Sequence, residues 1–101
     1  MRFDPSAEIS DTDAHGIIRE IVANGSLIIS NHAKKRMAER GYTTHDVEHI
    51  LLHGSITGKE LNANLNNWAY TVKGYDLDGD MGGVVAAIAK RMTSIVITVL
   101  S

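Results

Sequence analysis

The pattern of apolar and polar positions divides the chain into a helical first half and a β-rich second half. Apolar residues recur every three or four positions in three early segments, and this spacing predicts amphipathic helices. Each segment has a residue that can cap a helix start and a glycine that can end a helix. The expected caps and stops are Ser10 or Asp11 with Gly25, Asn31 with Gly41, and Thr43 or Thr44 with Gly54.

Short β-prone runs make up the rest of the pattern. Residues 26–30 (SLIIS) form an apolar run between the first two helices. After Gly54 the period changes, and residues 55–75 mix β-formers with Asn and Gly. Trp68, Tyr70 and Val72 alternate with less apolar neighbours, as in a half-buried strand. Two further strands are expected over GVVAAIAK and SIVITVL, with turns at DLDGDMGG and KRMT. This order predicts an α+β fold, with the N-terminal helices packed on one face of an antiparallel β-sheet.

Length and composition favour one globular domain. We expect a single domain over residues 1–101, with residues 1–25 as an N-terminal helical extension and residues 26–101 as the core. The absence of cysteine excludes a disulfide framework, a thiolate nucleophile and a Cys-based zinc site. The start, MRFDPSAEISDTD, lacks the basic end and apolar run of a signal peptide, and no apolar run has the length of a membrane span. We therefore expect a cytoplasmic protein without membrane contact.

Charge is unevenly distributed along the chain. The formal net charge of -2 argues against a strongly basic nucleic-acid-binding protein. Residues 34–40 nevertheless carry four cations, Lys34, Lys35, Arg36 and Arg40, against Glu39 alone. A local basic patch is therefore predicted on the second helix.

The second helix also carries the most suggestive chemistry. On a helical wheel His32, Arg36 and Arg40 form one stripe, which borders the apolar face of Ala33 and Met37. Histidine exchanges a proton near neutral pH, and a guanidinium group binds phosphate oxygens in a fork. Metal-free RNA cleavage needs both: a proton-transfer group at the 2′-hydroxyl and a cation for the charge on phosphorus.

The same stripe has a purely structural interpretation. A histidine can pack at a helix start while arginines extend along the edge of the core. Arg40 lies nearest the apolar face, and it could bond sheet carbonyls or an acid such as Glu60 or Asp76. If the polar ends of these three side chains are accessible to solvent, a catalytic role is favoured. If internal hydrogen bonds occupy them, a structural role is favoured.

Two other clusters resemble metal sites. His45, His49 and His53 have the spacing of ligands on a helix, but the wheel places them away from the apolar face and no third preorganised ligand accompanies them. We interpret them as a solvated face and expect no metal there. The aspartates of DLDGDMGG alternate as in a calcium loop, but the glycine and glutamate required at its sixth and twelfth positions are absent. A hairpin turn is expected instead.

The segment ISNHAKKRMAERGYTTHDVEHILLHGSI resembles the small bacterial family called domain of unknown function 4258. Its members typically show His-Ala, an Arg four residues later, a further Arg-Gly, then a capped Asp-Val helix and a Gly before the sheet. With the later strands ending near VITV, the resemblance covers roughly residues 28–99. It implies kinship in fold with the RelE/ParE toxin superfamily, in which two helices precede a curved antiparallel sheet, so that residues 26–101 would be a toxin-like core.

The resemblance also implies a function. Toxins of that superfamily include metal-independent RNA endonucleases held inactive by an antitoxin, and on this analogy His32 would transfer protons while Arg36 and Arg40 contact the phosphate. The expected partners are an antitoxin and RNA or the ribosome, no cofactor is expected, and the oligomeric state stays open. The alternative is a non-catalytic protein- or nucleic-acid-binding module of the same fold, with the exposed histidine face and Leu52 as its contact surface.

Overall fold

Three helices and five strands follow one another in this computed structural model, which describes every residue except 1–3, 5, 63–65 and 101. The helices are α1 (Asp11–Asn24), α2 (Asn31–Arg40) and α3 (Thr44–His53). The strands are β1 (Ser26–Ile29), β2 (Ser55–Asn62), β3 (Asn67–Tyr75), β4 (Met81–Lys90) and β5 (Thr93–Leu100). The expected α+β class is confirmed. Within the described residues, no helix is long and apolar enough to cross a membrane.

Each helix starts at a hydroxyl side chain that accepts a backbone hydrogen bond. Ser10, Ser30 and Thr43 each accept from the amide three residues later, which satisfies a donor that the first helical turn leaves unpaired. The expected Asn31 cap is therefore wrong by one residue. Ser30 takes this role because its Oγ also donates to the carbonyl of Ile97 on β5 at 3.0 Å, which anchors the start of α2 to the sheet.

The strands form one sheet in the order β1-β5-β4-β3-β2. Strands β2 to β5 pair antiparallel with their neighbours in sequence, whereas β1 pairs parallel with β5. The sheet is therefore mixed, although mostly antiparallel. Strand β2 is not predicted from the sequence, because its polar residues and the register irregularity between Ile56 and Gly58 weaken the period-two pattern. The turn expected at DLDGDMGG is confirmed for residues 76–80, which join β3 to β4 in a hairpin, whereas Met81, Gly82 and Gly83 already belong to β4.

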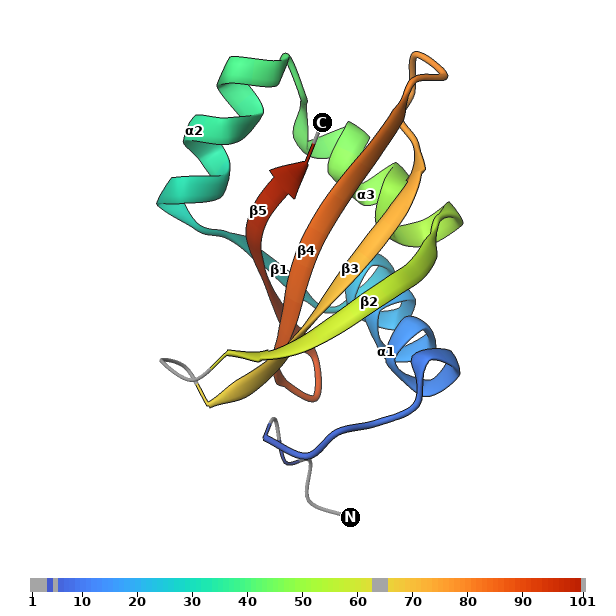
Figure 1. Ribbon diagram of the computed structural model, residues 1–101, viewed down its shortest axis with the longest axis vertical. Helices are drawn as coiled ribbons and strands as arrows, with labels where there is room; N and C mark the ends of the chain where they lie inside the picture. Colours follow the sequence, from blue (N-terminus) through green and yellow to red (C-terminus); the bar gives the residue numbers. More distant parts are fainter. Residues whose placement is uncertain (1–3, 5, 63–65, 101) are drawn as a thin grey trace.

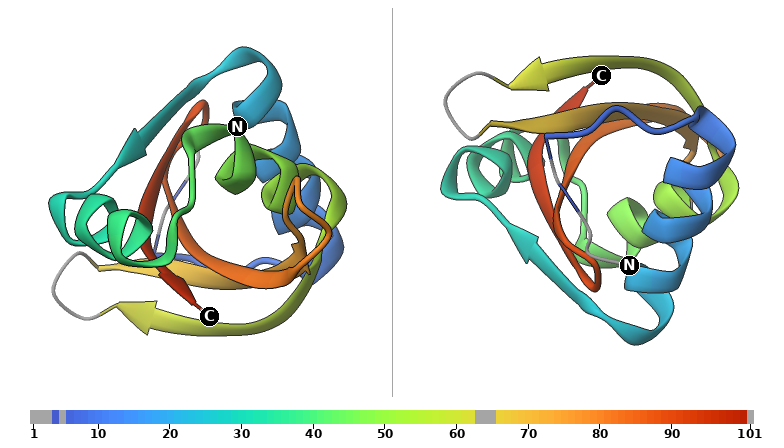
Figure 2. Two further views of the ribbon diagram at one scale, coloured as in Figure 1. Left: turned by 90° about the horizontal axis from the view of Figure 1, so that it is seen from above. Right: turned by 90° about the horizontal axis from the view of Figure 1, so that it is seen from below.

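The sheet curves around α3, and α1 lies beside α3 (Figures 1 and 2). Helix α2 lies beside β5, on the side of the molecule away from α1. Helices α1 and α3 place Ile18, Ile21, Ile50 and Leu51 in the core with no exposed surface. Burying an aliphatic side chain of this size contributes roughly 1.5–3 kcal/mol to stability. The sheet contributes Tyr70, Val72, Val84, Ala86, Ile88, Val96 and Val99 to the same cluster.

Helix α3 ends in direct contact with β3. A Cβ atom on Gly54 would lie 2.5 Å from the carbonyl oxygen of Lys73, and one on Gly74 would lie 2.8 Å from the Cα atom of Gly54. Both contacts involve backbone atoms, so a larger residue at either position would force the helix away from the strand. The two glycines therefore set the distance between α3 and β3.

Asp46 connects the start of α3 to the β3–β4 hairpin. Its Oδ2 accepts hydrogen bonds from the Thr43 amide at 2.9 Å and the Thr43 hydroxyl at 3.0 Å, completing a capping box. Its Oδ1 accepts from the amide of Leu77 at 3.0 Å. The side chain is buried, and the hydrogen bonds from the Thr43 and Leu77 backbones hold the pKa of Asp46 below its usual value against the effect of desolvation.

We predict that Asp46→Ala lowers the free energy of unfolding by about 1–3 kcal/mol, because it removes a cap and takes a hydrogen-bond acceptor from the part-buried amides of Thr43 and Leu77. The folded-state pKa lies below the unfolded value, so the carboxylate stabilises the fold fully above pH about 4 and loses this effect as pH falls further. Urea unfolding should show the difference between wild type and Asp46→Asn shrinking below that pH.

Asp78→Asn is the matched control, because Asp78 is exposed on the same hairpin. Its free energy of unfolding should stay close to that of the wild type. An Asp46→Ala protein as stable as the Asp78→Asn control would contradict the assigned role of Asp46.

Candidate functional site

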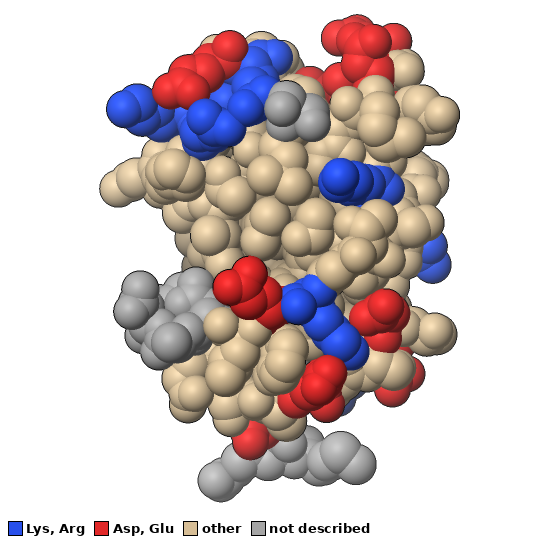
Figure 3. Space-filling model, in the orientation of Figure 1, with Lys and Arg blue, Asp and Glu red and all other residues tan. Residues whose placement is uncertain are grey.

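Helix α2 presents its cations on the surface of the molecule. Lysine and arginine side chains gather over this helix in Figure 3, beside one acidic side chain. We call Lys34, Lys35, Arg36 and Arg40 the α2 basic patch. The helix packs against the rest of the fold through Ala33 and Met37, which are buried as the wheel predicted, and Arg36 and Arg40 border this buried side.

The predicted stripe lies along one edge of α2 with a gradient of burial. His32 is exposed, while Arg36 and Arg40 are partly buried. Arg36 Nη1 lies 3.5 Å from Glu39 Oε2, in a pair whose side chains are 34% and 48% exposed. Such an exposed pair contributes roughly 0–1 kcal/mol, so it does not lock the guanidinium group.

Arg40 behaves differently from the expectation. Its Nε is buried and has no hydrogen-bond partner among the described residues. Neither Glu60 nor Asp76 forms an ion pair with it. Asp76 instead uses its Oδ1 to accept from the amides of Asp78 and Asp80 within the hairpin. The buried Nε agrees with the place of Arg40 nearest the apolar face, and among the described residues no ion pair joins Arg40 to either of the two acids considered above.

The stripe therefore offers separate groups and not a hydrogen-bonded catalytic cluster. In the described part of the chain, no hydrogen bond joins His32 to either arginine or to an acid. The imidazole of His32 is exposed and can exchange a proton with a bound molecule. Arg36 can turn to a phosphate at the cost of one weak surface pair.

The three histidines of α3 face away from the buried side of that helix. His45 and His53 are exposed, and His49 Nδ1 lies 2.8 Å from the carbonyl oxygen of Tyr75. A carbonyl only accepts, so Nδ1 of His49 carries the proton. The rings of His49 and His53 lie 4.7 Å apart between centroids. Across the described residues, no group of three or more His, Cys, Asp or Glu is arranged to hold a metal ion.

A pocket of about 230 Å³ lies between α1 and β2, and sequence analysis missed it. Its lining residues are Asp11, Thr12, His15, Arg19, Ser55 and Ile56. We call it the α1–β2 pocket. It brings an imidazole, a guanidinium group, a carboxylate and two hydroxyl groups to one site.

Two residues of this pocket are held by the end of α3. His15 Nε2 lies 3.1 Å from the carbonyl oxygen of Leu51, and Arg19 Nε donates to the carbonyl of Leu52 at 3.0 Å. These carbonyl groups belong to the last turn of α3, where carbonyl groups have no hydrogen-bond donors within the helix itself. His15 and Arg19 have the same spacing as His32 and Arg36, so a search for the His-x-x-x-Arg pattern would have found both pairs.

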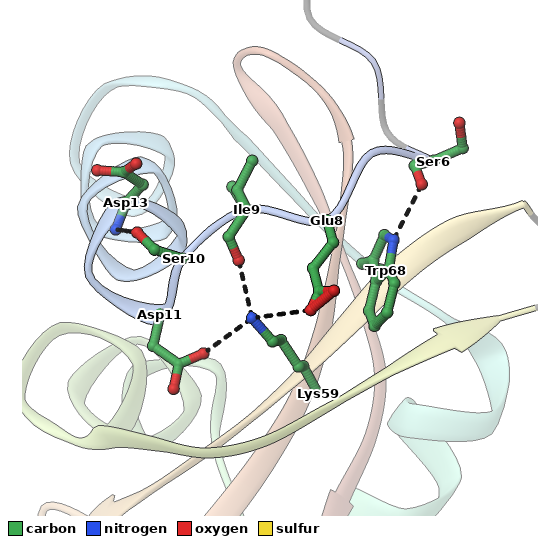
Figure 4. A network of polar contacts seen from close by, with 8 residues as sticks. All are labelled: Ser6, Glu8, Ile9, Ser10, Asp11, Asp13, Lys59 and Trp68. Carbon is green, nitrogen blue, oxygen red and sulfur yellow. Dashed lines mark hydrogen bonds and ion pairs between the residues drawn. The ribbon is translucent and has the colours of Figure 1, made fainter.

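Residues 6–10, which precede α1, lie against β2 and β3 through Lys59 and Trp68 (Figure 4). Lys59 on β2 lies 3.3 Å from Glu8 Oε2 and 3.5 Å from Asp11 Oδ1, and it donates to the carbonyl of Ile9 at 3.0 Å. Trp68 donates to the carbonyl of Ser6 at 2.9 Å. Desolvation lowers the pKa of Lys59, but the two carboxylates outweigh it and raise the pKa above its usual value.

The family of the chain is established by sequence comparison. The family described as Domain of unknown function (DUF4258) matches residues 29–101, and the chain belongs to it. The match begins at the last residue of β1, so α1 lies outside it, whereas α2 and the α2 basic patch lie within it. No match to a curated protein or to a solved structure was found.

We predict that calorimetric titration with Zn²⁺ reveals no stoichiometric, submicromolar site on α3. Nδ1 of His49 is occupied by Tyr75, and the described residues place no third ligand beside His49 and His53. His49→Ala should therefore give the same titration as the wild type. A tight site that disappears in His49→Ala would contradict this prediction.

Proposed function

We propose that the chain is a toxin-like, metal-independent RNA endonuclease of a bacterial toxin–antitoxin type system, related to the RelE/ParE toxins and acting in the cytoplasm. Helix α2 would contact the RNA. One observation supports the proposal: among the residues that the structure describes, no strong internal bond occupies the polar ends of the stripe. His32 is exposed, Arg36 has one weak surface pair, and Arg40 has no ion pair with a described acid.

The proposed reaction is attack of a ribose 2′-oxygen on the adjacent phosphorus. His32 would take the 2′-hydroxyl proton as the new O–P bond forms and the bond to the 5′-oxygen breaks. The 5′-oxygen would leave with a proton taken from water, and the other fragment would end in a 2′,3′-cyclic phosphate. Arg36 and Arg40 would stabilise the charge on the phosphoryl oxygens.

Arg36 can bind RNA in spite of its contact with Glu39. Releasing the exposed pair costs roughly 0–1 kcal/mol. A hydrogen bond between charged partners, such as guanidinium and phosphate, contributes roughly 1.5–3 kcal/mol. Because releasing the pair costs so little, a phosphate that binds the guanidinium group in a fork and is shielded from water can displace Glu39. Glu39 then limits the affinity without preventing binding.

A non-catalytic binding module of the same fold is the second candidate. Its support is the exposed apolar surface of the β3–β4 hairpin, where Tyr75, Leu77 and Met81 are 60%, 57% and 56% exposed. Tyr75 and Met81 are directly paired across the two strands. A protein partner could bury such a surface. In the toxin proposal the same hairpin is a candidate contact for the antitoxin.

We predict that inducing the chain alone in bacteria arrests growth and that His32→Ala relieves the arrest. In vitro, the purified chain should cleave RNA in the presence of EDTA and leave 2′,3′-cyclic phosphate ends. Loss of a general acid–base group should reduce the cleavage rate by about 10²–10⁴-fold.

His45→Ala is the control for this test, because it removes an equally exposed histidine from the neighbouring helix. It should leave both growth arrest and cleavage unchanged. Undisturbed growth with soluble wild-type protein, or equal activity of the two histidine variants, would favour the binding module.

We further predict that RNA binding depends on salt through the α2 basic patch. In a His32→Ala background, replacing Lys34 and Lys35 by Gln should reduce the slope of log affinity against log salt by about 1.4, or about 0.7 for each lost phosphate contact on a single strand. Fluorescence anisotropy with a labelled RNA at several salt concentrations measures this slope. The control replaces Lys90 and Arg91, two exposed cations near the β4–β5 turn, and should leave the slope unchanged.

A further inference from the structure

We propose that the α1–β2 pocket binds a small, hydroxyl-bearing phosphate monoester, such as a sugar phosphate. The proposal concerns a different surface from α2 and does not depend on the endonuclease activity. At about 230 Å³ the pocket is smaller than the usual range of about 300–1,000 Å³ for drug-sized ligands. Its size therefore suits a phosphate with a small organic group attached.

Arg19 is the main phosphate-binding group. Arg19 is exposed, and its Nε donates to the carbonyl of Leu52 at 3.0 Å, which holds one nitrogen of the guanidinium group beside the pocket. The Nη donors have no hydrogen-bond partner among the described residues, and no described acid forms an ion pair with Arg19. A preoriented guanidinium group with two free nitrogens matches the fork geometry in which arginine binds phosphate.

His15 adds a second group whose orientation is known. Because the carbonyl of Leu51 can only accept a hydrogen bond, Nε2 of His15 must carry a proton. Nδ1 is then the nitrogen left for a ligand. It accepts from a protonated phosphate oxygen when the ring is neutral and donates to an ionised one when the ring is charged. In either state the imidazole can share a proton with a phosphate.

The remaining polar groups fit the rest of the ligand. The hydroxyl groups of Thr12 and Ser55 line the same pocket and can donate to phosphate oxygens. Asp11 would repel an anion, but its Oδ1 lies 3.5 Å from the ammonium group of Lys59, which offsets its charge. A carboxylate in this position can accept hydrogen bonds from sugar hydroxyls. Asp11 therefore favours a phosphorylated sugar over inorganic phosphate.

The test is an NMR titration of the full chain with ribose 5-phosphate, following the Arg19 Nε–H signal and the His15 ring nitrogens. We expect saturable shifts at both residues, weaker binding of inorganic phosphate, and no binding of ribose. Arg19→Gln should weaken the affinity for ribose 5-phosphate by about 10- to 100-fold, as expected for a lost hydrogen bond between charged partners. Arg91→Gln, which removes an exposed arginine from the β4–β5 turn, is the matched control and should bind as the wild type does.

Because Arg19 also holds the end of α3, a second variant separates binding from folding. Ser55→Ala leaves both bonds to the α3 carbonyls in place, and it should weaken binding while the amide spectrum stays that of the folded wild type. Absence of saturable shifts in the wild type, or equal affinity in Arg19→Gln and Arg91→Gln, would overturn the proposal. His15 and Arg19 would then serve only to fasten α1 to α3. RNA cleavage by the wild type would be unaffected by that outcome.

Discussion

The direct contact between the end of α3 and β3 is the constraint on which the arrangement of the molecule depends. With no side chain at Gly54 or Gly74, the helix ends against the strand, and the chain enters β2 at the next residue. This places Ser55 and the last carbonyls of α3 next to α1. His15 and Arg19 can therefore bond those carbonyls and line the α1–β2 pocket at the same time.

Sequence predicts the local features of this fold well because their causes are local. Hydroxyl caps, glycine stops and apolar spacing define α1 and α3, and Ser10 and Thr43 are the caps in the structure. The pairing of strands has no such local cause. The parallel contact of β1 with β5 joins residues about seventy positions apart, and the cap of α2 at Ser30 depends on the same contact through Ile97.

The same difference between local and long-range causes applies to the candidate sites. The wheel of α2 correctly buries Ala33 and Met37, because one helix determines which of its sides is apolar. It could not identify the surroundings of Arg40, whose neighbours come from other elements. The α1–β2 pocket is a stronger example, because its walls come from α1 and β2 and its two key side chains are held by α3. A sequence pattern can suggest His15 and Arg19, but only the assembled fold joins them to Ser55.

The two His-x-x-x-Arg pairs differ in how their surroundings prepare them for a ligand. On α2 the exposed His32 and the partly buried Arg36 lie beside other cations, an arrangement that suits a long anionic chain bound through many weak contacts. On α1 each side chain has one nitrogen fixed by a carbonyl, which reduces the conformational entropy that a ligand must remove. Fixed donors in a small pocket favour one compact ligand over a polymer. Identical spacing in the sequence thus supports two different kinds of binding, and the difference lies in the contacts that each helix makes with the rest of the fold.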